Sequence, residues 1–121
     1  MNLTLTKEQL INGLQSVQNV VGSRTTLPIL SNVLLRARNN SLELTATDLD
    51  VTVVCSVEAT VKQEGATTVP VKRLFGIVRE LGNSDLDMEV DEKNVCSIRS
   101  GSSFYKINGL AAEEFPALPV F

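Results

Sequence analysis

The feature that most constrains the fold is one order of patterns that occurs twice along the chain. An amphipathic helix pattern covers residues 6–21, and a second one runs from Pro70 to about Leu81. Their starts lie about 64 residues apart, and three short alternating strand patterns follow each helix. We therefore predict one α+β domain over residues 1–121, built from two β-α-β-β-β units with both helices packed on antiparallel sheets.

Local signals support these elements. Thr6 and Gln9 form a T-x-x-Q capping box at the start of the first helix, and Gly22 suits its end. Leu10, Leu14 and Val17 share one face of that helix. The predicted strands cover residues 29–38, 41–47, 51–59, 66–71, 85–91, 94–99 and 102–109.

The second helix separates apolar from basic side chains. At about 100° per residue, Leu74, Ile77, Val78 and Leu81 gather on one side. Lys72, Gly76 and Arg79 gather on the opposite side, and Arg73 lies about a quarter-turn away. This pattern predicts a buried inner face and a basic outer face. Such a face is ordinarily only solvated, but it can also touch phosphates without reading bases.

Charge is segregated along the chain, whose net charge is −3. Residues 71–80 carry three basic residues against one acidic residue, whereas residues 85–92 carry five acidic residues and no basic one. The acidic residues of 85–90 alternate with Leu86, Met88 and Val90. We interpret that alternation as the solvated face of a half-buried strand rather than a metal site.

Composition argues against most catalytic chemistry. The chain has no histidine, which removes histidine-based nucleophile systems and histidine metal ligands. No phosphate-binding glycine loop occurs, and we expect no cofactor. Cys55 and Cys96 lie in strand patterns and are expected to be small buried thiols. With neither a signal peptide nor a membrane span in the sequence, a cytoplasmic location is expected.

Two loops leave alternatives open. Asp48 and Asp50 could ligate Mg²⁺, but a turn between two strands explains them more simply. Arg24 stands alone among turn-forming residues after the first helix. It is either a solvated loop charge or a contact for an anion.

Five segments together resemble a known family. They are GSRTTLPILSNVLL, LELTATDLD, GATTVPVKRLFGIVREL, SIRSGSSFYKI and EEFPALP, in this order. In sequence and order they are similar to the N-terminal domain of the bacterial DNA polymerase III β subunit, the sliding clamp. The resemblance covers nearly the whole chain.

The resemblance implies a DNA-clamp fold and a non-catalytic function. Family members have three such domains, and two subunits join head to tail into a ring with helices lining the hole. Double-stranded DNA passes through without sequence-specific contacts, and the ring serves as a processivity factor for DNA polymerase III. The clamp loader and the polymerase bind through later domains, which this chain lacks.

The resemblance also assigns roles to individual residues. It implies that Arg24, Lys72 and Arg79 contact DNA. It places Arg73, Tyr105 and Ile107 at the subunit interface, with packing inside their own sheet as the alternative for Tyr105 and Ile107. A different class of function, a small structural or protein-interaction domain that associates through an edge strand, also fits the sequence. An enzyme would need a carboxylate or metal centre that the residues do not assemble.

Overall fold

The computed structural model describes residues 1–18, 31–48, 51–82 and 85–115. In chain order its elements are β1 (Asn2–Thr6), α1 (Lys7–Gln18), β2 (Asn32–Arg38), β3 (Ser41–Thr47), β4 (Thr52–Glu58), β5 (Thr60–Gln63), β6 (Gly65–Pro70), α2 (Val71–Glu80), β7 (Asp85–Val90), β8 (Val95–Ser100), β9 (Ser103–Asn108) and the 3₁₀ helix η2 (Ala112–Glu114). No helix in these described segments is long and apolar enough to cross a bilayer.

The strands form two antiparallel sheets that exchange their first strands. One sheet has the order β5-β1-β7-β8-β9, and the other has the order β4-β3-β2-β6. The strand before α1 therefore pairs with β7 of the second unit, and the strand before α2 pairs with β2 of the first. Each half thus completes the sheet of the other half, and the two units form one interlocked domain.

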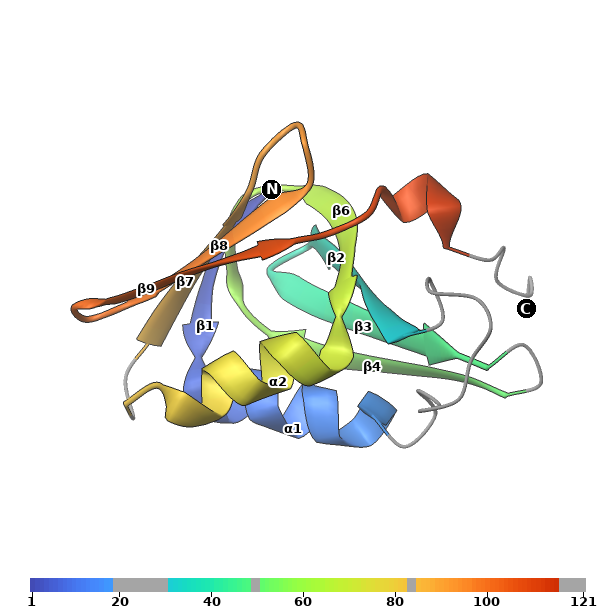
Figure 1. The fold of residues 1–121 in the computed structure, drawn as a ribbon, viewed down its shortest axis with the longest axis horizontal. Helices are drawn as coiled ribbons and strands as arrows, with labels where there is room; N and C mark the ends of the chain where they lie inside the picture. Colours follow the sequence, from blue (N-terminus) through green and yellow to red (C-terminus); the bar gives the residue numbers. More distant parts are fainter. Residues whose placement is uncertain (19–30, 49–50, 83–84, 116–121) are drawn as a thin grey trace.

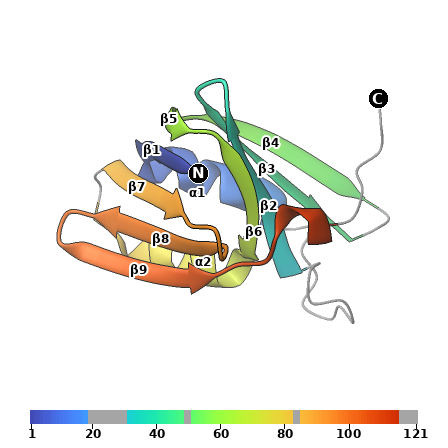
Figure 2. The same ribbon diagram turned by 90° about the horizontal axis from the view of Figure 1, so that it is seen from above.

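Both helices lie side by side on the same side of the two sheets (Figures 1 and 2). A single cluster of buried side chains fills the space between helices and sheets. Leu10, Leu14 and Val17 enter it from α1, and Leu74 and Val78 enter it from α2. The predicted α+β architecture with two helices on antiparallel sheets is confirmed.

Element boundaries match the sequence patterns closely, with two exceptions. The two-unit scheme requires a strand before α1, but none of the predicted strand ranges covers β1. The reason is that Thr6, the last residue of β1, is also the helix cap and was assigned to the helix. The short strand β5 was not predicted, because it is polar apart from Val61 and gives no alternation to detect. Gly22, the predicted end of the first helix, lies outside the described residues.

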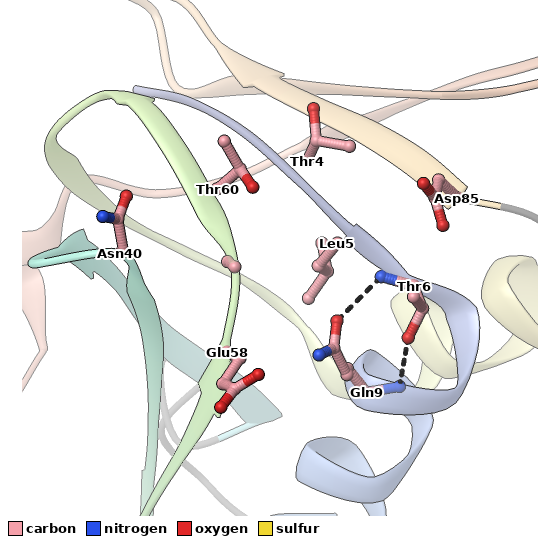
Figure 3. Close-up of a pocket in the computed structure, with 9 residues that line it drawn as sticks. Thr4, Leu5, Thr6, Gln9, Asn40, Glu58, Thr60 and Asp85 are labelled. Carbon is pink, nitrogen blue, oxygen red and sulfur yellow. Dashed lines mark hydrogen bonds between the residues drawn. The ribbon is translucent and has the colours of Figure 1, made fainter.

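The capping box at the start of α1 is present as predicted. The Thr6 backbone N–H donates to Gln9 Oε1, and the Gln9 backbone N–H donates to Thr6 Oγ1, both at 3.0 Å (Figure 3). These reciprocal bonds satisfy two donors at the helix start that would otherwise lack partners. They also fix the sharp change from strand β1 to helix α1.

Lys7 ties the start of one helix to the end of the other. Its Nζ donates to the backbone carbonyls of Leu81 at 2.6 Å and Arg79 at 3.2 Å. These carbonyls lie at the C-terminal end of α2, where the helix has no backbone donors for its last turn. The positive charge of Lys7 also opposes the negative end of the α2 dipole.

Lys7→Met is expected to lower the free energy of unfolding by about 1–2 kcal/mol, since two charge-assisted bonds to the end of α2 are lost. Urea unfolding followed by circular dichroism measures the change. Lys72→Met is the matched control, because the exposed Lys72 on α2 should alter stability by less than about 0.5 kcal/mol. Equal destabilisation by both substitutions would contradict the capping role of Lys7.

Candidate nucleic-acid interface

The basic side chains of α2 face away from the core, as the helical projection predicts. Lys72, Arg73 and Arg79 are exposed, while Leu74 and Val78 between them are buried. The Arg79 guanidinium lies over the Phe75 ring, 5.7 Å from its centroid. That contact supports the long side chain along the helix surface while its donors stay free to reach an anion.

The adjoining surface of α1 is polar and carries little charge. Its exposed residues are Glu8, Asn12, Gln15 and Ser16. Because α1 and α2 lie side by side, the helical layer presents one surface in which basic groups stand beside neutral polar groups (Figure 1). Arg24 lies outside the described residues, so its position relative to this surface stays a prediction.

The acidic residues of β7 point to the opposite side of the domain. Asp85, Asp87 and Glu89 are exposed, and they alternate with Leu86 and Met88, which belong to the core beneath the helices. The solvated-face interpretation is confirmed. Within the described parts of the chain, no three His, Cys, Asp or Glu side chains are placed to hold a metal ion. The exposed carboxylates of β7 therefore lie on the sheet side, away from the basic residues of α2, and they share the outer face of their sheet with Lys62 and Arg99.

Asp48 forms part of a turn between two strands, as the simpler of its two interpretations predicts. Its Oδ1 accepts the Val51 backbone N–H at 2.7 Å, and its own N–H donates to the Val51 carbonyl. A side chain used in this way closes the connection between β3 and β4. Asp50 lies outside the described residues.

The edge strand β9 exposes two aromatic side chains. Tyr105 is 37% exposed and Phe104 is 47% exposed. Arg99 and Lys106 flank the Phe104 ring at 5.2 and 5.8 Å from its centroid. Ile107 is only 1% exposed and belongs to the core cluster, so its side chain packs within its own domain. At this sheet edge only the backbone N–H and C=O groups of Ile107 could contact a partner.

The four sheet edges differ in how open they are. The edge of β6 carries a backbone bridge to Leu110, and β5 is short and polar. The other two edges, β9 and β4, expose large apolar side chains, and on the β4 side these are Val51 and Val54. Sequence reasoning assigned no role to the β4 edge, although apolar residues on both faces of VTVVCSV could have indicated it.

A polar groove of about 550 Å³ lies where the two sheets meet, beside the start of α1 (Figure 3). Glu58 and Asp85 contribute carboxylates to its walls, and Asn40 contributes an amide. Among the described residues, none that the sequence assigns to DNA or to the subunit interface lines this groove. It is therefore separate from the basic helical surface.

With this geometry, comparison with solved structures places the fold among bacterial sliding clamps. A DNA polymerase sliding clamp from Caulobacter crescentus superposes with a TM-score of 0.94 and 34% identity, covering 99% of this chain and 33% of that one. A sliding clamp from Bacillus subtilis gives a TM-score of 0.94 and 30% identity over 99% of this chain and 34% of that one.

Sequence comparison identifies the family. The model for the DNA polymerase III beta subunit, N-terminal domain, matches residues 1–119. Beta sliding clamps from Chlamydia muridarum and Pseudomonas putida are 36% and 40% identical over 98% of this chain and 32% of their own length. The chain belongs to this N-terminal domain family, and it spans about a third of the length of these relatives.

The two thiols are expected to differ sharply in reactivity. Cys96 is buried, and burial raises the pKa of its thiol to about 12, while Cys55 is only half-buried. Since the thiolate is the nucleophile, iodoacetamide at pH 8 should modify Cys55 and leave Cys96 intact in the folded protein. Mass spectrometry of the digested protein measures both sites. Denatured protein serves as the control, and rapid native labelling of Cys96 would contradict its place in the core.

Proposed function

We propose that this chain is the first domain of a DNA sliding clamp, a non-catalytic processivity factor for DNA polymerase III in the cytoplasm. The observation that carries the proposal is the exposure of Lys72 and Arg79 on the helical side, with the β7 carboxylates of Asp85, Asp87 and Glu89 on the opposite, sheet side. A ring with helices inside would turn the basic residues of α2 toward the duplex and the β7 carboxylates toward the solvent.

In this proposal Arg24, Lys72 and Arg79 contact phosphates of double-stranded DNA. Lysine and arginine side chains on a rigid helix can meet phosphates at any sequence, because every phosphate is alike. The neutral polar side chains of α1 add little charge to the same surface. Contacts that are few and sequence-independent suit a ring that holds DNA by enclosing it and must slide.

Two sheet edges that carry no further strand among the described residues support head-to-tail assembly. Strand β9 closes one sheet and β4 closes the other, so the domain can accept neighbours at two different surfaces. Two non-identical surfaces of this kind generate rings when the rotation closes. We assign the β9 edge, with Tyr105 and the backbone of Ile107, to the interface with a second subunit through strand addition, and we assign Arg73 of α2 to the same interface. The clamp loader and the polymerase would bind other domains of the full-length protein.

Replacing Arg24, Lys72 and Arg79 together by alanine in the full-length protein should weaken binding to linear duplex DNA and flatten its salt dependence. Each lost phosphate contact should lower the slope of log affinity against log salt concentration by about 0.9. Fluorescence anisotropy of labelled duplexes of several sequences measures both quantities.

The matched control replaces Arg38, Lys62 and Lys93, three exposed basic residues outside the helices. This variant has the same net charge as the test variant but should keep the wild-type slope. If both triple variants lower the slope equally, only overall charge matters and the assigned contacts are wrong. If neither does, the helical surface does not meet DNA.

Tyr105→Glu should weaken association of the full-length subunits at least about tenfold, because a charge would replace an aromatic anchor at the β9 edge. Sedimentation over a range of concentrations measures the change. Thr60→Glu, on the short exposed strand β5, is the control and should leave association unchanged. Unchanged association of the Tyr105 variant would exclude this edge from the interface.

A second candidate function is a small structural or protein-interaction domain that associates through an edge strand. The exposed Phe104 and Tyr105 on β9 favour it. The two candidates differ in their need for the basic residues. If association depends on Tyr105 but DNA retention does not depend on Lys72 and Arg79, the interaction domain is favoured over the clamp.

A further inference from the structure

After β9 the chain does not leave the domain but crosses the free edge of β6. We call residues Gly109–Phe115 the exit arm. Thr68 and Leu110 exchange two backbone hydrogen bonds, N–H to carbonyl, at 3.0 and 2.9 Å. Figure 1 shows the chain passing from β9 across β6 into the short helix η2. The exit arm thus lies beside β6 at the edge of the four-stranded sheet and is joined to it by one β-bridge.

Buried hydroxyl groups fasten the exit arm to β6. The Thr68 hydroxyl donates to the Leu110 carbonyl at 3.0 Å and accepts from Asn32 Nδ2 at 3.0 Å. The Thr67 hydroxyl lies 2.9 Å from Asn94 Oδ1 and 3.3 Å from the Leu110 carbonyl. Thr67 and Thr68 are fully buried. If the arm left, the Thr68 hydroxyl would lose its acceptor at a buried site, which is unfavourable.

The crossing point also leaves no room for a side chain. A Cβ atom at Gly109 would lie 2.3 Å from the Thr68 carbonyl oxygen and 2.8 Å from that of Asn94. The Gly109 N–H donates to the Asn94 carbonyl at 2.8 Å, and Asn94 itself holds a left-handed backbone conformation with φ 62°. The exit arm is therefore held both by β6 of one sheet and by the β7–β8 turn of the other.

Two buried apolar residues of the described chain lie outside the main core. Of the buried apolar residues in the described chain, only Leu34 and Phe115 lie outside the main core cluster. Leu34 alternates with Val33 and Leu35, which face the helices, so Leu34 faces the opposite side of the sheet. It pairs with Thr68 across the sheet, directly beside the bridge to the arm. The short helix η2 contacts β6 (Figure 2).

We propose that the exit arm is a positioning device that fixes the direction in which the chain leaves this domain. Because one cluster joins the arm to both sheets, the arm has a set angle to the basic helical surface. A following domain would then keep that angle, and its helices would face the same hole. This inference rests on the proposed clamp function, because only a closing ring requires such a fixed angle between domains.

The test uses the full-length protein with Thr67→Val and Thr68→Val together, which keeps side-chain size and removes both hydroxyls. Thr45→Val is the matched control. Thr45 is fully buried in the same sheet, and its hydroxyl has no hydrogen-bond partner among the described residues. Because the double variant also leaves the Asn32 amide without an acceptor, Gly109→Ala is a second test variant that disturbs the arm without touching Asn32.

Three measurements decide the outcome. Hydrogen exchange of the Leu110 peptide should become about tenfold faster in both test variants, the change expected for one lost hydrogen bond of typical strength. The lifetime of the ring on closed circular DNA should shorten several-fold, whereas affinity for linear duplex should stay unchanged, because Lys72 and Arg79 are intact. Thr45→Val should match the wild type in all three.

Faster exchange at Leu110 with a wild-type lifetime on circles would overturn the positioning role. Unchanged exchange in both test variants would show that the threonines and Gly109 do not hold the arm, and would also overturn it. A separate result concerns the proposed function itself. If the wild-type protein leaves closed circles as fast as linear DNA, the clamp function fails, and the inference about the exit arm fails with it.

Discussion

The rest of the structure depends on the pairing of β1 with β7 and of β6 with β2. Through these two antiparallel contacts each half of the chain completes the sheet of the other half. The exchange brings the two sheets together edge to edge and leaves α1 and α2 adjacent over one shared core. The Lys7 contact with the last turn of α2 becomes possible only because the exchange places those helix ends together.

Side-chain placement on the elements then follows from ordinary periodicity. A helix that buries Leu74 and Val78 must expose Lys72 and Arg79, and a strand that buries Leu86 and Met88 must expose Asp87 and Glu89. Since both helices cover one side, these two rules put the basic residues of α2 and the acidic residues of β7 on opposite sides of the domain. The electrostatic arrangement needs no ion pairs to maintain it, and the described residues include a single one, between Arg38 and Glu43 at 3.7 Å.

Sequence patterns were enough to predict both helices, the capping box at Thr6 and Gln9, most strands and the faces of α2. These features are local, because a few neighbouring residues determine them. The strand exchange was not predicted, since nothing in NLTLT or GATTVP states which distant strand it will join. Ile107 is buried and Tyr105 is exposed although both lie on the same face of β9, and this difference depends on tertiary structure, because Ile107 is covered by contacts with the core cluster. The exit arm was missed for the same reason: Thr67, Asn94 and Gly109 are remote in sequence and meet only in the fold.

The exchange of β1 also has a consequence for biosynthesis. Leu3 and Leu5 leave the ribosome more than 80 residues before their partners Met88 and Leu86. Until then β1 has only the short strand β5 to pair with, whereas the neighbouring strands β2, β3 and β4 can form hairpins as soon as they appear. During most of the synthesis of the domain, β1 therefore lacks its β7 neighbour. The five-stranded sheet can form only after β7, β8 and β9 have been made.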